Sequence, residues 1–250
     1  MKIIAIIPAR MAASRFPGKP LAPILGLPMI EHVRRRVALC EELDEVVVAT
    51  CDEEIQRVVE KAGGKVIMTS HRYERCTDRI AEAARSLNAD VFVNVQGDEP
   101  LVLPWMIEEA FKPFLADFDL PAVNLVARII SAEEFNDPNI PKVVTSRFGD
   151  ILYISREPIP SQKRLTSEDS LRLKQLGIIA FRGDFLQCFS QLAPAPLEKA
   201  ESVDMMRAIE HGYRVRAVEI KGEMISVDRT EDIRRVEDAL SKDLLVGSYL

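Results

Sequence analysis

The first hundred or so residues alternate between short apolar runs and stretches whose apolar residues recur at helical spacing. The apolar runs cover residues 3–7, 45–51, 65–70 and 90–95. They are rich in β-branched residues, which is typical of strands buried on both faces of a parallel sheet. Repeating units of one strand and one helix, about twenty residues each, predict a parallel α/β sheet with right-handed crossovers.

The pattern changes from about residue 120. Further strand-like runs, separated by loops rich in Asp, Asn, Pro and Ser, cover residues 122–129, 142–146, 150–155 and 173–182. Helical spacing returns at 183–192 and 196–212, and a strand at 214–222 and a helix at 230–242 follow. We therefore expect a single domain over residues 1–250, with a mixed or antiparallel β insertion at approximately 120–185.

Composition narrows the class of protein. The net charge is −6, which argues against binding to nucleic acid or to an anionic membrane surface. The four cysteines, Cys40, Cys51, Cys76 and Cys188, show no C-x-x-C spacing, so neither a zinc site nor a redox motif is indicated. The apolar start is too short for a signal peptide or a membrane span, and a cytoplasmic protein is expected.

A basic loop follows the first apolar run. Arg10, Arg15 and Lys19 lie within ten residues of one another, and Pro17, Gly18 and Pro20 stiffen the turn. Open α/β sheets bind ligands at the carboxyl ends of their strands, and arginine forks with a lysine charge suit a polyphosphate. The alternative is that these are ordinary solvated loop charges. Neither a Walker A loop nor a G-x-G-x-x-G fingerprint is present.

Acidic residues end the fourth apolar run. Asp98 and Glu99 follow Gly97, which is expected to let the backbone turn sharply. With Asp228 as a second carboxylate, Asp98 would suit Mg²⁺ bound to phosphate oxygens. The alternative for Asp228 is a helix cap or a turn residue.

Two further groups of polar residues are expected to be structural. The triplet of arginines at residues 34–36 is interpreted as the solvated face of a helix, and His32 and His211 are expected to support helices.

Several motifs carry a resemblance to a known family. The run PARMAASRFPGKPLAPILGLPMI resembles the opening motif of the sugar-nucleotide cytidylyltransferases, most of all the 3-deoxy-manno-octulosonate cytidylyltransferase (CMP-Kdo synthetase) family. The stretches VNVQGDEP, DPNIPKVV, LYISREPIP, LGIIAFR and SVDRTED follow in the same order. The resemblance therefore covers nearly the whole chain.

The resemblance implies a mainly parallel, Rossmann-like nucleotidyltransferase sheet flanked by helices, with a smaller insertion used for dimerisation. It implies an Mg²⁺-dependent homodimer that transfers CMP from CTP to the anomeric hydroxyl of a 3-deoxy-2-ulosonic acid. Kdo or a close relative would be the acceptor, pyrophosphate would leave, and the product would serve lipopolysaccharide synthesis.

The resemblance also implies roles for individual residues. Catalysis would rest on Arg10, Arg15, Lys19 and Asp98. The nucleotide would contact Pro8, Ala9, Arg10, Arg15, Lys19, Thr77 and Gln96. The acidic sugar would contact Gln96, Arg156, Gln175, Ile179, Asp204 and Met205. Asp98 and Asp228 would hold the metal, and the alternative for Arg156 is to hold a strand or a subunit contact.

The chain departs from the family pattern in two regions. Arg75 and Cys76 replace the usual Ser-Gly before Thr77, and we expect Cys76 to be a buried structural thiol. On the sugar side, the chain has Gln175, Ile179, Asp204 and Met205 where the family shows His, Tyr, Glu and Gln. These changes leave two alternatives open: a different acceptor, such as 8-amino-Kdo, Kdn or a sialic-acid-like sugar, or a noncatalytic nucleotide-binding protein.

Overall fold

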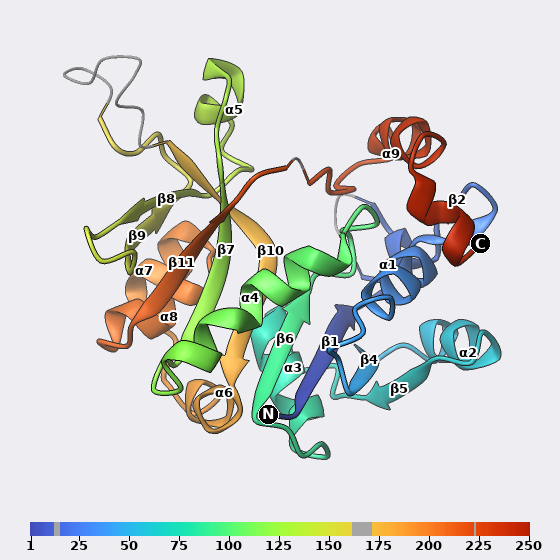
Figure 1. The fold of residues 1–250 in the computed structure, drawn as a ribbon, viewed down its shortest axis with the longest axis horizontal. Coiled ribbons are helices and arrows are strands. Elements are labelled where there is room, and N and C mark those ends of the chain that lie inside the picture. Colours follow the sequence, from blue (N-terminus) through green and yellow to red (C-terminus); the bar gives the residue numbers. More distant parts are fainter. Residues whose placement is uncertain (13–15, 162–171, 223) are drawn as a thin grey trace. The chain divides into compact units, whose positions relative to one another are not determined.

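The computed structural model describes residues 1–12, 16–161, 172–222 and 224–250 (Figure 1). The chain forms two compact units: unit 1 comprises Met1–Glu108 and Met224–Leu250, and unit 2 comprises Glu109–Glu223. The insertion expected at about 120–185 lies inside unit 2. The prediction of a single domain stays a prediction.

Unit 1 is built on a parallel sheet in the order β6, β1, β4, β5. Its strands are Val91–Val95, Ile3–Ala9, Glu45–Thr50 and Lys65–Met68 respectively, and each neighbouring pair is parallel. All seven residues of β1 are buried, because β1 lies between two other strands. The parallel α/β sheet expected from the alternating pattern is confirmed.

Helices follow each strand of unit 1. They are α1 (Met29–Val37), α2 (Glu53–Lys61), α3 (Cys76–Ala84) and α4 (Pro104–Ala116), the last of which continues into unit 2. α1 packs on β1 and β4, α2 on β4 and β5, and α3 on β1, β4 and β6. α1, α2 and α3 therefore each bury an apolar face against strands of this sheet.

Short elements and the returning chain complete unit 1. The 3₁₀ turn η1 (Lys19–Leu21) precedes the hairpin of β2 (Pro23–Ile24) and β3 (Leu27–Pro28), and the chain ends with α9 (Asp232–Leu240) and η3 (Leu244–Ser248). One apolar cluster joins the two ends of the chain and contains Ile24, Met29, Val227, Val236 and Leu240. The C-terminal segment is thus part of the core of unit 1.

Unit 2 contains a mixed sheet. β7 (Ala122–Arg128) is parallel to β11 (Val215–Ile220) and antiparallel to β10 (Leu173–Arg182). β8 (Lys142–Thr145) pairs antiparallel with β10 and with β9 (Ile151–Ser155). The helices of this unit are α5 (Ala132–Asn136), α6 (Gly183–Phe189), α7 (Pro196–Glu201) and α8 (Met205–Glu210). The mixed pairing expected after about residue 120 is confirmed, whereas the bounds of the insertion, about 120–185, stay a prediction.

The first strand runs further than the sequence suggested. The apolar run at residues 3–7, followed by Pro8, predicts a strand that stops at the proline, but β1 continues to Ala9. Pairing with β6 ends at Ile6, whereas pairing with β4 continues to the end of β1. The proline therefore lies where the strand has a partner on one side only, which a residue without an N–H donor tolerates.

Two expectations about helices in unit 2 are wrong. Residues 196–212 form two helices, because Ser202 adopts φ 54 and ψ 46 at the end of α7. Left-handed backbone stops an α-helix. The five-residue helix α5, which Ser131 caps by accepting from the Glu134 N–H at 3.0 Å, falls where no helix was expected.

The arginine triplet of α1 is not a solvated face. The side chain of Arg36 is fully buried, and its guanidinium donates to the Val102 carbonyl at 2.8 Å and pairs with Asp243 at 2.8 Å. Arg34 and Arg35 both bind the buried carboxylate of Glu31. The expectation failed for Arg36 because its partners come from distant segments, and for Arg34 and Arg35 because their partner Glu31 is itself buried.

His32 is structural, as expected. It is buried, and its ring nitrogens lie 2.8 Å from the Ile24 carbonyl and 2.9 Å from the Tyr249 hydroxyl. Burial lowers the pKa of His32. Tyr249 thus fastens the C-terminal segment to α1 within the same chain. Among the helices that the structure describes, none is long and apolar enough to cross a membrane.

Candidate active site

A cavity of about 230 Å³ opens in unit 1 at the carboxyl ends of β1 and β6. Every residue that lines it belongs to unit 1. These residues are Pro8, Ala9, Arg10, Phe16, Lys19, Pro20, Met29, Cys76, Gln96, Gly97, Asp98 and Asp228. Ligand sites in open α/β sheets lie at this edge, so the basic loop and the acids occupy the expected place.

Gly97 is required by a close approach rather than by a left-handed turn. A Cβ atom at this position would lie 2.6 Å from the Pro8 carbonyl oxygen. Any larger residue would push the end of β6 away from the end of β1. The glycine therefore lets Gln96 and Asp98 lie against the loop that follows β1.

Three charged side chains meet in this cavity. The Lys19 ammonium lies 2.6 Å from a carboxylate oxygen of Asp98 and 3.9 Å from one of Asp228, and it donates to the Val227 carbonyl at 2.8 Å. The Val227 N–H in turn donates to the Asp98 carbonyl at 3.0 Å. This pair of backbone contacts brings Asp228 beside Asp98, as the sequence predicted.

Backbone conformation places the lysine. Gly18 adopts φ 74 immediately before η1, a conformation that glycine enters at little cost. Its N–H donates to the Met11 carbonyl at 3.1 Å, which ties the end of the basic loop back to its beginning. Lys19 therefore starts from a constrained turn, and its side chain points to the acids.

Glu99 is a third carboxyl group near this cluster, and sequence reasoning gave it no role. It is buried, and Ser226 donates a hydrogen bond to it at 2.8 Å. Burial, followed by the nearby charge of Asp98, raises the pKa of Glu99 to about 8. In the sequence, only its position directly after Asp98 indicates that Glu99 belongs to this cluster.

The remaining nucleotide-side residues differ in their exposure to the cavity. Pro8, Ala9, Gln96 and the exposed Arg10 line it. Thr77 is buried and is not among the lining residues. Arg15 lies outside the described residues.

Cys76 was expected to be a buried structural thiol, and this expectation is wrong. It is only partly buried, forms no disulfide and lines the cavity at the first position of α3. Because Cys76 begins α3 rather than lying in the middle of the helix, its thiol is not enclosed by neighbouring side chains. It lines the same cavity as Lys19 and Asp98.

Apart from Gln96, which lines the cavity of unit 1, the residues assigned to the sugar lie in unit 2. The Arg156 guanidinium donates to the carbonyls of Glu201 at 2.8 Å and Pro138 at 3.0 Å. The Gln175 amide donates to the side-chain oxygen of Asn124 at 2.6 Å. Arg156 thus joins the segment after β9 to α7, which is the structural role weighed as its alternative.

The other three sugar-side residues lie on β10 and α8. Ile179 is 6% exposed and Met205 is fully buried, whereas Asp204 is the N-cap residue of α8. A side chain with almost no exposed surface cannot contact a ligand directly in this conformation. It can only position the residues that pack around it. Their assigned role in sugar binding stays a prediction.

Comparison with known proteins identifies the family. The sequence model of the family described as "Cytidylyltransferase" matches residues 4–222. The 3-deoxy-manno-octulosonate cytidylyltransferase of Geobacter metallireducens is 46% identical over 97% of this chain and 99% of its own length. The protein of the same name from Geotalea uraniireducens is 44% identical over 97% of this chain and 100% of its own length.

Solved structures agree with the sequence relatives. A structure of CMP:2-keto-3-deoxy-manno-octonic acid synthetase complexed with CTP superimposes with a TM-score of 0.91 at 38% identity, covering 98% of this chain and 100% of that one. A cytidylyltransferase from Leptospira borgpetersenii, 18% identical, shares the fold with a TM-score of 0.65 over 98% of this chain and 88% of that one. The chain therefore belongs to the cytidylyltransferase family, and within it to the 3-deoxy-manno-octulosonate cytidylyltransferases.

Proposed function

We propose that this chain transfers CMP from CTP to the anomeric hydroxyl of the acidic sugar 3-deoxy-manno-octulosonate (Kdo), with release of pyrophosphate. The observation that carries the proposal is the lysine held between two carboxylates, Asp98 and Asp228, at the strand ends of unit 1. The names of the relatives support the nucleotide and the acceptor. The product would enter the synthesis of lipopolysaccharide.

The charges of this cluster support a divalent cation. One ammonium group faces two partly exposed carboxylates, so the cluster carries an excess of negative charge that a cation would offset. Mg²⁺ binds through one or two carboxylates together with phosphate oxygens. Asp98 and Asp228 would hold the ion, which would supply polarisation of the α-phosphate and charge neutralisation.

The chain's own cations would do the remaining electrostatic work. Lys19 and Arg10 line the cavity, and we assign them, together with Arg15, to the triphosphate and the departing pyrophosphate. Pro8, Ala9, Gln96 and Thr77 are assigned to the rest of the nucleotide. Because the acceptor hydroxyl is the nucleophile, positioning and charge stabilisation suffice, and no nucleophilic side chain is needed.

Recognition of the acidic sugar is assigned to unit 2 and to Gln96. A guanidinium fork suits a carboxylate, but the backbone bonds of Arg156 use part of that fork. The amide of Gln175, fixed by Asn124, offers a positioned polar group. Asp204 is assigned a polar contact, and Ile179 and Met205 would set the shape of the sugar site.

The decisive experiment measures pyrophosphate release from CTP with Mg²⁺ and a panel of Kdo, 8-amino-Kdo, Kdn and sialic acid. We expect release with Kdo. Release with another acid alone would replace the acceptor, and silence with every acid, by a protein that still binds CTP, would favour the noncatalytic alternative.

The metal ligand has its own test. Asp98→Asn should lower kcat by about 10³-fold or more, because it removes a cation ligand and a partner of Lys19. The matched control is Asp119→Asn, whose carboxylate is 97% exposed and should leave turnover unchanged. An Asp98→Asn enzyme with normal turnover would refute the metal assignment.

We also propose that the chain acts as a homodimer through the edge strand β9. Among the described strands, β9 pairs with β8 alone. Its Leu152 is 59% exposed, and Phe148, shortly before β9, is 72% exposed. Large exposed apolar side chains favour association with a second copy. Light scattering should detect a dimer that Leu152→Lys converts to a monomer, whereas Leu115→Lys, at a position 68% exposed on α4, should remain dimeric. A wild-type monomer would contradict the proposal.

A cytoplasmic location is proposed as well. None of the four cysteines forms a disulfide, and thiols persist in reducing compartments. Cell fractionation would test this.

A further inference from the structure

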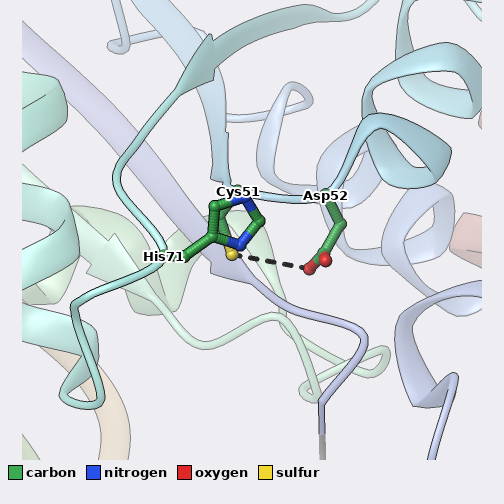
Figure 2. Close-up of side chains that lie close together, drawn as sticks. All are labelled: Cys51, Asp52 and His71. Carbon is green, nitrogen blue, oxygen red and sulfur yellow. Dashed lines mark hydrogen bonds between the residues drawn. The ribbon is translucent and has the colours of Figure 1, made fainter.

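Three side chains of different chemistry gather at the ends of β4 and β5, apart from the residues that line the cavity. Cys51 and Asp52 follow β4, and His71 follows β5 (Figure 2). The thiol sulfur, one carboxylate oxygen and one imidazole nitrogen all lie within 4.8 Å of one another. No C-x-x-C or similar spacing links the three residues, so this group could not be recognised from the sequence.

The distances suit a tetrahedral metal ion. The Cys51 sulfur lies 3.6 Å from a carboxylate oxygen of Asp52, to which the thiol now donates a weak hydrogen bond (Figure 2). Zinc bonds of about 2.3 Å to sulfur and 2.0–2.2 Å to oxygen at a tetrahedral angle separate the two ligands by about 3.5 Å. Two of the three donors are therefore already at the spacing that an ion would impose.

The surrounding backbone holds the donors in place. The Thr69 N–H donates to the Thr50 carbonyl at 2.8 Å, which keeps the ends of β5 and β4 together just before His71 and Cys51. The Met11 N–H donates to the Asp52 carboxylate at 2.8 Å. A carboxylate has four lone-pair positions, so Asp52 can keep this bond and still bind a metal.

We propose that Cys51, Asp52 and His71 bind one thiophilic divalent ion of the Zn²⁺ class, with the fourth position open to water. A thiolate, an imidazole and a carboxylate are the ligands that zinc takes in proteins. Thiolate and carboxylate together balance the charge of the ion, and the thiol proton is released to solvent on binding. His71 is exposed, which gives the ion a route of entry.

Other acidic groups of the chain suit this ion less well. Within the described residues, Cys40, Glu42 and Glu108 also bring three donor atoms within 4.8 Å, but that group has no imidazole. Burial also raises the pKa of Cys40 to about 12, which opposes the thiolate. The oxygen-only pair Asp98 and Asp228 suits a hard ion such as Mg²⁺.

The site would be linked to the basic loop through hydrogen bonds. Asp52 accepts from Met11, whose carbonyl accepts from Gly18, the residue before Lys19. An ion that fixes the Asp52 carboxylate would therefore also fix the first and last turns of that loop.

The test uses the full chain stripped of metal with a chelator. We expect one equivalent of Co²⁺ to give the intense visible bands of a tetrahedral complex and a near-ultraviolet charge-transfer band from the thiolate. Zn²⁺ should displace the Co²⁺, and competition with a chromophoric chelator should give its affinity.

Variants identify the ligands. Cys51→Ser should abolish the charge-transfer band, and His71→Ala, at an exposed position that leaves the fold intact, should weaken Zn²⁺ binding by about tenfold or more. Cys40→Ser, Cys76→Ser and His211→Ala are the matched controls and should bind as the wild type does. Loss of the band in Cys40→Ser, unchanged affinity in His71→Ala, or no binding of either ion by the wild type would each overturn the proposal.

Discussion

Glu99 is a carboxyl group that the fold keeps protonated at neutral pH. It lies inside unit 1, directly after Asp98, and accepts a hydrogen bond from Ser226. Burial penalises the charged form most, the charge of Asp98 adds to this, and the pKa rises from 4.5 to about 8. The neutral form limits the negative charge that Lys19 faces.

The raised pKa makes the stability of the protein depend on pH. Below about pH 4.5 Glu99 is neutral in both states, and as pH rises to about 8 only the unfolded state ionises. The free energy of unfolding should therefore fall over this window, by up to about 1.4 kcal/mol per pH unit for one proton. Urea unfolding of Glu99→Gln without divalent ions should show a shallower fall, because the amide mimics the neutral acid.

Asp119→Asn, which removes an exposed carboxylate, is the control for this experiment and should keep the slope of the wild type. Parallel pH profiles for Glu99→Gln and the wild type would show that Glu99 ionises normally.

At the scale of elements, α1 is anchored by one fully buried arginine. Arg36 joins the helix to the Val102 carbonyl after β6 and to Asp243 before η3. Three segments that are remote in sequence thus meet on a single guanidinium. Burial of a charge is costly unless the charge is paired. The ion pair with Asp243 offsets that cost, although the buried Nη1 atom of Arg36 has no hydrogen-bond partner among the described residues.

Arg36→Ala should lower the free energy of unfolding by about 3 kcal/mol, because it leaves Asp243 and buried carbonyls without their partner. The neighbouring substitution Arg35→Ala is the matched control. Arg35 is 30% exposed and shares Glu31 with Arg34, so its loss should cost about 1 kcal/mol or less. Equal losses for the two variants, measured by urea unfolding, would contradict the anchoring role.

Most elements could be predicted because their signals are local. The apolar runs of β1, β4, β5 and β6 can be recognised without a distant partner, and the ends of β1 and β6 predict where Lys19 and Asp98 meet. The break at Ser202 was missed because serine carries no signal for left-handed backbone, and α5 is too short for periodicity.

Other features depend on contacts between distant segments. The burial of Arg36, the raised pKa of Glu99 and the meeting of Cys51 with His71 all follow from how strands pair and loops return. Cys76 faces the cavity for the same reason, since its exposure depends on where α3 begins. Local sequence patterns cannot predict these features, because each depends on which distant segments come into contact.

At the scale of the whole molecule, the candidate residues divide between the two units. The nucleotide and metal candidates, including Lys19, Asp98 and Asp228, lie in unit 1. The sugar candidates, among them Arg156 and Gln175, lie in unit 2 apart from Gln96. CTP and the sugar should therefore slow hydrogen–deuterium exchange in different segments of the chain.

Hydrogen–deuterium exchange can measure which segments each substrate protects. CTP with Mg²⁺ should slow exchange in the segments 8–12 and 96–99 of unit 1 and leave residues 173–182 unchanged. Addition of Kdo to Asp98→Asn with CTP should then slow exchange around residues 173–182 and 202–206. Protection by CTP alone in the unit 2 segments would contradict this division of roles.

The distance in sequence between Asp98 and Asp228 has a consequence for synthesis on the ribosome. The nascent chain carries Asp98 for most of its synthesis, but the opposing carboxylate and the core residues Val227, Val236 and Leu240 emerge only near the end. A chain that stops before residue 227 would lack both the carboxylate of Asp228 beside Lys19 and three residues of the apolar cluster of unit 1. The proposed release of pyrophosphate would thus require residues 227–240 to have left the ribosome.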